Sequence, residues 1–197
     1  MNQADIYLTS DTMANDYLKE DPFALLLGML LDQQIPMERA FSAPFTLDRR
    51  MKAHGFGALS PSSLFELTLD QVTQLFSEKP ALHRFPKAMA QKAHQLATVV
   101  MELYSGKAEQ IWTEAESGER LLQRLKAMNG FGTEKAKIFI ALLGKRFNSA
   151  PEGWQEASEP FSLTGRARSV ADASSPEALR EIREFKRAVK TSNGLSG

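Results

Sequence analysis

Two glycines divide a pair of amphipathic helical patterns near the middle of the chain, and this feature constrains the fold more than any other. Apolar residues precede the glycines at helical spacing: Leu121, Leu122, Leu125 and Met128. Others follow along one face of a second helix: Ala136, Phe139, Ile140, Leu143 and Phe147. We predict that Gly130 and Gly132 end the first helix, since glycine adopts positive φ without steric cost, and that Thr133 caps the second. The stretch 120–147 is therefore predicted to fold as helix, tight turn and helix.

The same stretch is strongly basic, with a single acid, Glu134. Its lysines and arginines are Arg120, Arg124, Lys126, Lys135, Lys137, Lys145 and Arg146. The whole chain has a formal net charge of zero, so this charge is segregated along the sequence. The start of a helix leaves backbone N–H groups free for an anion such as phosphate, and a basic helix pair with such a turn is typical of a DNA-backbone contact. An ordinary loop between two core helices is the alternative.

A second pattern lies about a hundred residues earlier. Asp21 and Pro22 predict a helix start, with aspartate as the N-cap and proline at the first helical position. The residues that follow are apolar on nearly every side until Asp32, which predicts a helix buried at the centre of the protein. We expect this helix to run to Gln34 and to present Gln33 and Gln34 at its end, although a plain polar helix terminus would look the same.

Together the two patterns resemble the helix-hairpin-helix (HhH-GPD) superfamily of base-excision DNA glycosylases, typified by endonuclease III and the adenine and 3-methyladenine glycosylases. The hairpin pattern is hydrophobic-Asn-Gly-Phe-Gly-x-x-Lys-Ala, and the earlier pattern is Leu-Leu-x-x-x-Leu-Leu-Asp-Gln-Gln. The resemblance spans the chain from about Asp21 to Trp154. It implies that Gln33 or Gln34 fills or probes the gap left by a flipped base. It also implies DNA contacts by Asn129, Gly130, Phe131, Gly132, Thr133, Lys135 and Lys137.

The chain departs from the family at both catalytic positions. Where the family carries its catalytic aspartate this sequence has Glu152, and where strand-nicking members carry a Schiff-base lysine it has Glu134. We therefore expect a monofunctional enzyme in which Glu152 stabilises oxocarbenium-like charge on the sugar. Glu134 and Asp172 are further candidates for this carboxylate. The alternative is that Glu152 is only a solvated loop residue. Lys135 stands one residue out of register, so we expect it to contact a phosphate and not to act as nucleophile.

Aromatic residues near the hairpin are candidates for contacts with an extruded base, because aromatic faces stack on bases. Trp154 is predicted to line a base pocket. Phe131 and Phe147 could do the same or act as a wedge. Each also has a plain role, since Phe147 continues the apolar stripe of the helix and Phe131 could anchor the turn from inside.

Composition limits the chemistry. The chain has no cysteine, which excludes disulfides, thiolate zinc sites and a cysteine-ligated iron–sulfur cluster. The resemblance is thus to a branch of the superfamily without that cluster, and with scattered histidines we expect no metal and no cofactor. No signal-peptide pattern opens the sequence, and the longest apolar run, Phe23 to Leu31, is too short to span a bilayer. We expect a cytoplasmic protein.

The remaining patterns are helical as well: residues 10–19, 36–52 with an irregularity at Pro44, 68–76, 85–104, and a last helix from Ser175 with Leu179, Ile182, Phe185 and Val189 inward. Residues 55–62 are interpreted as a loop. We predict an all-α, two-lobed fold like that of DNA glycosylases, forming one domain over residues 1–190 with a disordered tail at 191–197. The predicted function is that of a monomeric N-glycosylase acting on double-stranded DNA with a damaged or mispaired base. The alternatives are a non-catalytic DNA-binding protein with the same fold and a helical scaffold whose basic patch contacts an acidic protein.

Overall fold

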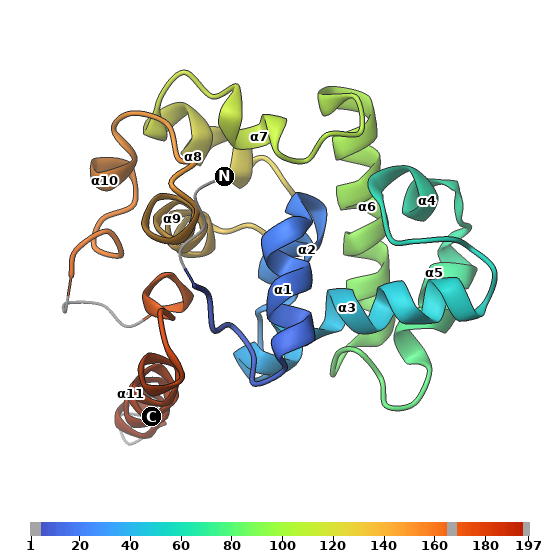
Figure 1. The fold of residues 1–197 in the computed structure, drawn as a ribbon, viewed down its shortest axis with the longest axis horizontal. Helices are drawn as coiled ribbons and strands as arrows, with labels where there is room; N and C mark the ends of the chain where they lie inside the picture. The colour runs from blue at the N-terminus through green and yellow to red at the C-terminus, as the bar shows by residue number, and fades with distance from the viewer. Residues whose placement is uncertain (1–4, 165–168, 195–197) are drawn as a thin grey trace.

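The computed structural model describes residues 5–164 and 169–194, with backbone alone for 189–194. Within these ranges the chain is helical and contains no strand, which confirms the predicted all-α class (Figure 1). No helix in the described part is long and apolar enough to cross a membrane. The α-helices are α1 (Thr12–Glu20), α2 (Pro22–Leu31), α3 (Met37–Ala53), α4 (Pro61–Glu66), α5 (Leu69–Ser77), α6 (Pro86–Tyr104), α7 (Gln110–Thr113), α8 (Gly118–Lys126), α9 (Thr133–Leu142), α10 (Trp154–Ala157) and α11 (Pro176–Gly194). A π-helical turn, Leu143–Phe147, extends α9, and a 3₁₀ turn, Val170–Asp172, precedes α11.

Helix α2 lies at the centre, with α3 to α6 on one side of it and α8 to α10 on the other (Figure 1). Its start is as predicted: Pro22 is the first helical residue, and the Asp21 carboxylate accepts the Ala24 N–H at 2.9 Å. Every residue from Phe23 to Leu31 is buried. The helix ends at Leu31, three residues earlier than expected, because the Asp32 backbone turns out of the helix at ψ 72°. The two glutamines therefore lie in the loop between α2 and α3 and not on the helix.

The structure corrects the expectations for two regions between α3 and α6. Helix α3 continues without a break through Pro44. In the predicted loop at 55–62, Gly55 and Gly57 do adopt positive φ, but a short helix, α4, begins within this range at Pro61. Its start is fixed by a capping box, in which the side chains of Ser60 and Ser63 each accept a backbone N–H from the other. A six-residue helix of this kind carries too few turns for apolar periodicity to reveal it.

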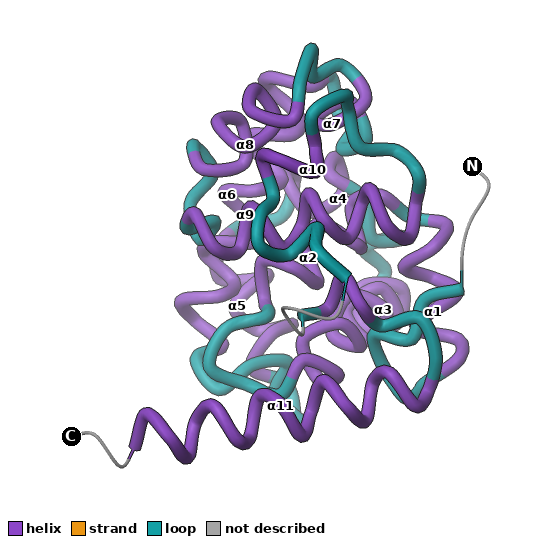
Figure 2. Tube along the Cα trace, turned by 90° about the vertical axis from the view of Figure 1, so that its left-hand side faces the viewer, coloured by secondary structure: helices purple, strands orange, loops and turns teal. Residues whose placement is uncertain are grey.

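The buried apolar side chains form one continuous core that joins the helices on both sides of α2. A division into two lobes stays a prediction. Helix α11 lies across one end of the molecule (Figure 2). It buries Leu179 and Ile182 as predicted, whereas Phe185 is 43% exposed, contrary to the prediction. The Val189 side chain lies outside the described residues. The disordered tail was predicted from residue 191, whereas the described helix α11 continues to Gly194; residues 195–197 are outside the described part.

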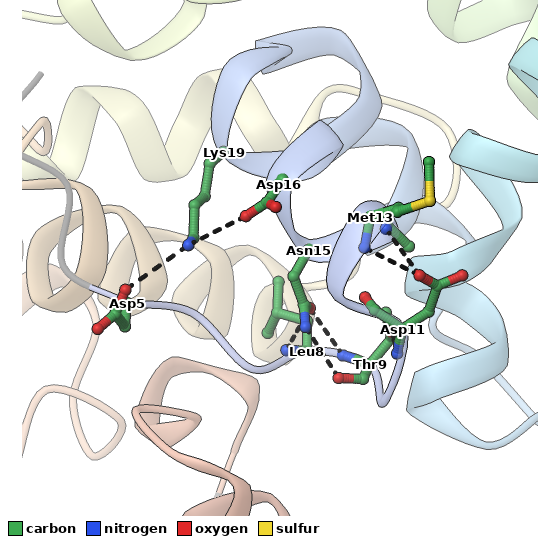
Figure 3. Close-up of polar contacts among 9 residues, drawn as sticks. Asp5, Leu8, Thr9, Asp11, Met13, Asn15, Asp16 and Lys19 are labelled. Carbon is green, nitrogen blue, oxygen red and sulfur yellow. Dashed lines mark hydrogen bonds and ion pairs between the residues drawn. The ribbon is translucent and has the colours of Figure 1, made fainter.

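The N-terminal segment is fixed to α1 by one buried amide (Figure 3). The Asn15 side-chain oxygen accepts the backbone N–H groups of Leu8 and Thr9, each at 3.0 Å, and its amide nitrogen donates to the Thr9 carbonyl at 3.0 Å. The Tyr7 N–H donates to the carbonyl of Ala173 at 3.1 Å. These bonds hold the extended segment between α1 and the residues that precede α11.

Candidate nucleic-acid interface

The turn between α8 and α9 has the predicted conformation at its centre and an unexpected one at its end. Gly130 has φ +96°, a backbone conformation that residues other than glycine rarely adopt. Gly132, in contrast, has φ −74° and is itself the N-cap of α9, so Thr133 is the first helical residue and not the cap. No side chain caps this helix, and the residues around its start, Gly132 to Glu134, are exposed. The first backbone N–H groups of α9 thus face solvent, in the geometry of an anion site.

The turn packs directly against the end of α2 and the side of α6. A Cβ added to Gly130 would lie 2.5 Å from Leu30 Cδ1 and 3.4 Å from Lys92 Cδ. Glycine is therefore required at this position both for its positive φ and for the close approach. The consequence is that two segments a hundred residues apart in the sequence form one surface.

Polar side chains from three elements converge at this contact. Lys135 Nζ donates to the Leu30 carbonyl at 2.8 Å, and Gln33 Nε2 donates to the same carbonyl at 2.7 Å. Lys92 Nζ, from α6, lies 3.4 Å from Gln33 Oε1. Two of the residues predicted from separate motifs, Gln33 and Lys135, thus meet at the C-terminal end of α2. We name Asp32, Gln33, Lys92 and Lys135 the α2-end cluster.

Two more predicted residues lie at its edge. Asn129 is exposed in the turn and donates through Nδ2 to Gln95 Oε1 at 2.8 Å. Gln34 is exposed and has φ +57°, which turns the chain sharply between α2 and α3. Because the Gln33 amide is already bonded within the protein, Gln34 is the freer of the two glutamines.

Lys135 does not lie on the exposed face of the turn, where a phosphate contact was expected. Its side chain is half-buried, and its ammonium lies 5.8 Å from the centre of the Phe131 ring. Burial lowers the pKa of Lys135 from 10.5 to about 8; Asp32 opposes this shift and Lys92 adds to it. Asp32 and Lys135 thus interact electrostatically at the end of α2, although the ion pair of Asp32 is with Lys186, at 3.6 Å.

Much of the basic charge counted in the sequence is used inside the molecule. Lys137 Nζ donates to the Glu159 carbonyl at 3.0 Å, so it too is engaged by the chain. The Arg124 guanidinium donates to backbone carbonyls at the end of α7, including that of Glu114 at 2.9 Å. Lys145 pairs with Asp172 at 2.8 Å. Among the bases of the hairpin, Lys126 at the end of α8 remains exposed next to the turn.

The predicted catalytic glutamate and pocket tryptophan lie at the opposite end of the hairpin from the turn. The Gly118 N–H, at the start of α8, donates to the Glu152 carbonyl at 2.7 Å. The Trp154 indole packs on Gly144, where an added Cβ would lie 2.5 Å from the ring. Gly144 follows the C-terminal end of α9, and a ten-residue helix is about 15 Å long. Neither Glu152 nor Trp154 therefore joins the α2-end cluster.

The other predicted residues have mainly structural positions. Phe131 and Phe147 are buried, at 3% and 4% exposure, which makes them anchors of the core. Glu134 is exposed in the first turn of α9, where a carboxylate favours the helix dipole. Asp172 pairs with Lys145 and accepts the Ser169 N–H at 3.0 Å.

Three residues that the sequence analysis gave no role lie at this surface or directly beneath it. Asp32 lies 3.6 Å from Lys186 of α11 as well as near Lys135. Lys92 reaches Gln33 from α6. His83 is buried; its Nδ1 accepts the Phe85 N–H at 3.0 Å, and its Nε2 therefore carries the proton and donates to the Gln33 carbonyl at 2.9 Å. Burial lowers the pKa of His83, which favours this neutral form. No motif signalled these contacts, because they arise only from packing.

A separate cavity of 530 Å³ lies between the N-terminal segment, α1 and α11. Charged groups in its wall are compensated within the chain. Lys19 Nζ lies 3.6 Å from Asp5 and 3.4 Å from Asp16 (Figure 3), and Arg183 pairs with Glu38. The cavity therefore offers no uncompensated charge that would select a charged ligand.

No family model, curated protein or solved structure matches this chain. Within the described residues, no group of three or more histidine, cysteine, aspartate or glutamate side chains is arranged to hold a metal ion.

Proposed function

We propose that this protein is a monofunctional DNA N-glycosylase of base-excision repair. The observation that carries the proposal is the packing of Gly130 on Leu30. This contact brings together an uncapped helix start suited to phosphate, the glutamine loop with its exposed Gln34, and the half-buried amine of Lys135.

In this proposal the turn binds the DNA backbone and the loop after α2 reads the lesion. The free N–H groups at the start of α9 hold a phosphate, and Lys126 and Lys92 add positive charge beside it. Gln34 enters the gap in the base stack, because its neighbour Gln33 is bonded to the Leu30 carbonyl. The target nucleotide leaves the stack before its glycosidic bond is broken.

The chemistry requires a carboxylate near the positive charge that develops on the sugar. Asp32 takes this role in place of Glu152, since Asp32 is the C-cap of α2, directly before the glutamine loop, and Glu152 lies beside the start of α8. Glu134 is not needed in this scheme. Lys135, which donates to the Leu30 carbonyl at the same end of α2, completes the polar surface that faces the sugar.

The experiment that tests the proposal is a single-turnover base-release assay. Duplexes carry uracil, alkylated purines, oxidised guanine or mismatches, and alkali reveals the abasic sites. Release from one of these lesions supports the glycosylase and identifies its substrate class. Release from none of them contradicts it.

A second candidate is a non-catalytic DNA-binding protein. The position of Glu152 favours it, because neither family position supplies a carboxylate to the α2-end cluster. If the protein is such a binder, it should bind duplex DNA without releasing a base. The logarithm of its affinity should fall linearly with the logarithm of the salt concentration.

A further inference from the structure

One exposed aromatic side chain stands beside the glutamine loop. Phe85 is 42% exposed and forms the N-cap position of α6. The aromatics predicted from the sequence to contact an extruded base or act as a wedge are unavailable, since Phe131 and Phe147 are buried and Trp154 packs on Gly144. Phe85 therefore offers the aromatic face that those residues do not.

Two hydrogen bonds fix Phe85 relative to the glutamines. The Phe85 N–H donates to His83 Nδ1 at 3.0 Å, and His83 Nε2 donates to the Gln33 carbonyl at 2.9 Å. His83 is 1% exposed, so this link is protected from water. The loop that ends at Phe85 is thereby held against the loop that follows α2.

The hairpin turn lies farther along α6 from the same loop. Lys92, which contacts both Gln33 and the turn at Gly130, is two helical turns after Phe85, about 10 Å along the axis. At 3.4 Å per nucleotide along one strand, this distance corresponds to about three nucleotides. A strand held by the turn can thus reach Phe85.

The surroundings of Phe85 are basic. The Arg84 guanidinium lies 5.2 Å from the centre of the Phe85 ring, and both Arg84 and Lys87 are exposed. Arg39 is exposed as well and donates to the carbonyl of Ala81 in the same loop. A ring flanked by cations suits a nucleic-acid strand, because a base stacks on the ring while phosphates meet the positive charges.

We propose that Phe85, with Arg84 against its ring, is a stacking residue that enters the DNA base stack beside the lesion, next to the Gln33–Gln34 loop. This inference rests on the proposed function and adds a second insertion point to it. Phe85 acts by unstacking neighbouring bases, and Arg84 adds a phosphate contact.

The test uses a duplex with a tetrahydrofuran abasic analogue and 2-aminopurine as the neighbouring base. Wild-type protein is expected to bind this duplex and raise the 2-aminopurine fluorescence as the base unstacks. Phe85→Ala is expected to lose most of this increase and to bind about tenfold more weakly, since a stacked base contributes about 1–3 kcal/mol. Phe85→Trp is expected to restore both.

Matched controls separate stacking from fold and from charge. Phe65→Ala removes a phenylalanine of similar exposure, 40%, from α4 and is expected to change neither readout. Phe85→Ala is expected to leave the slope of log affinity against log salt unchanged, whereas Arg84→Ala is expected to reduce it by about 1. Thermal unfolding of each variant confirms that the fold is retained.

The outcomes distinguish this inference from the proposed function. Wild-type affinity and fluorescence in Phe85→Ala would overturn the stacking role and leave the proposed function standing. Absence of DNA binding by wild-type protein would overturn both.

Discussion

At the scale of single residues, Gly130 decides how the hairpin meets the rest of the protein. Its φ of +96° and its contact with Leu30 each exclude a side chain. Asn129 and Lys135 take their positions from the turn that this glycine permits. A small change at Gly130 should therefore affect both stability and DNA binding.

We predict that Gly130→Ala lowers the free energy of unfolding by about 2 kcal/mol and weakens DNA binding, because the new Cβ adds backbone strain and displaces Leu30. Gly57→Ala is the matched control. Gly57 has φ +79° with nothing within 4 Å of an added Cβ, so this variant is destabilised by backbone strain alone. Urea unfolding measures both. Equal losses in the two variants would show that the contact with Leu30 contributes nothing.

Lys135 gives a prediction for pH dependence. Its folded pKa of about 8 lies below the unfolded value of 10.5, so the unfolded chain binds more protons between these values. The free energy of unfolding should rise with pH across this window, by up to about 3 kcal/mol relative to Lys135→Met, which cannot titrate. Chemical unfolding at several pH values tests this. Lys137→Met is the control, and its free energy of unfolding should keep the wild-type dependence on pH. If Lys135→Met also kept the wild-type dependence, the burial of a titrating amine at this position would be refuted.

At the scale of elements, α9 begins without a side-chain cap at the place where a phosphate is proposed to bind. A helix start that served only the fold would gain from a cap, and capping residues are common at such positions. Gly132 has a negative φ and open space around it, so a capping side chain fits there. Helices α3 and α6 also begin without a side-chain cap, so the start of α9 is distinguished by its exposure and by its position beside the glutamine loop.

Replacing this glycine should therefore affect stability and binding in opposite directions. Gly132→Asp is expected to stabilise the fold by about 0.3–1 kcal/mol through capping and the helix dipole, and to weaken DNA binding about tenfold or more by repelling phosphate. Gly132→Asn caps without charge and should weaken binding less. Thermal unfolding and a DNA titration measure the two effects. Unchanged DNA affinity in Gly132→Asp would show that the start of α9 does not bind phosphate.

At the scale of the whole molecule, the sequence predicted the helices better than the contacts between them. Apolar periodicity identified α6 and the stripe of α9, because burial of one face requires that spacing, and a run apolar on nearly every side identified the buried α2. The end of α2 was misjudged, since Asp32 to Gln34 fit a helix terminus and a loop equally well. Lys135 was expected on the surface because the sequence does not show that it packs against Leu30. The two residues are 105 positions apart and meet only in the folded protein.

The position of Glu152 shows why the candidate site was harder to predict than the fold. Counting residues along the chain gave Glu152 the place of a catalytic carboxylate, but the loop before α10 is fixed by its backbone bond to Gly118 and by Trp154 on Gly144. These contacts place it at the far end of α8. Asp32, in contrast, comes within electrostatic range of Lys135 only through the packing of the turn on α2, which no local pattern reveals.

The most direct test of the account is single-turnover base release by wild-type protein, Asp32→Asn and Glu152→Gln on the same lesion-bearing duplexes. We predict that wild-type protein and Glu152→Gln release the base at similar rates, while Asp32→Asn binds the duplex but is slower by about 100-fold or more, since it loses the charge that stabilises the transition state. Wild-type rates in Asp32→Asn, or no release by wild-type protein from any lesion, would contradict the account.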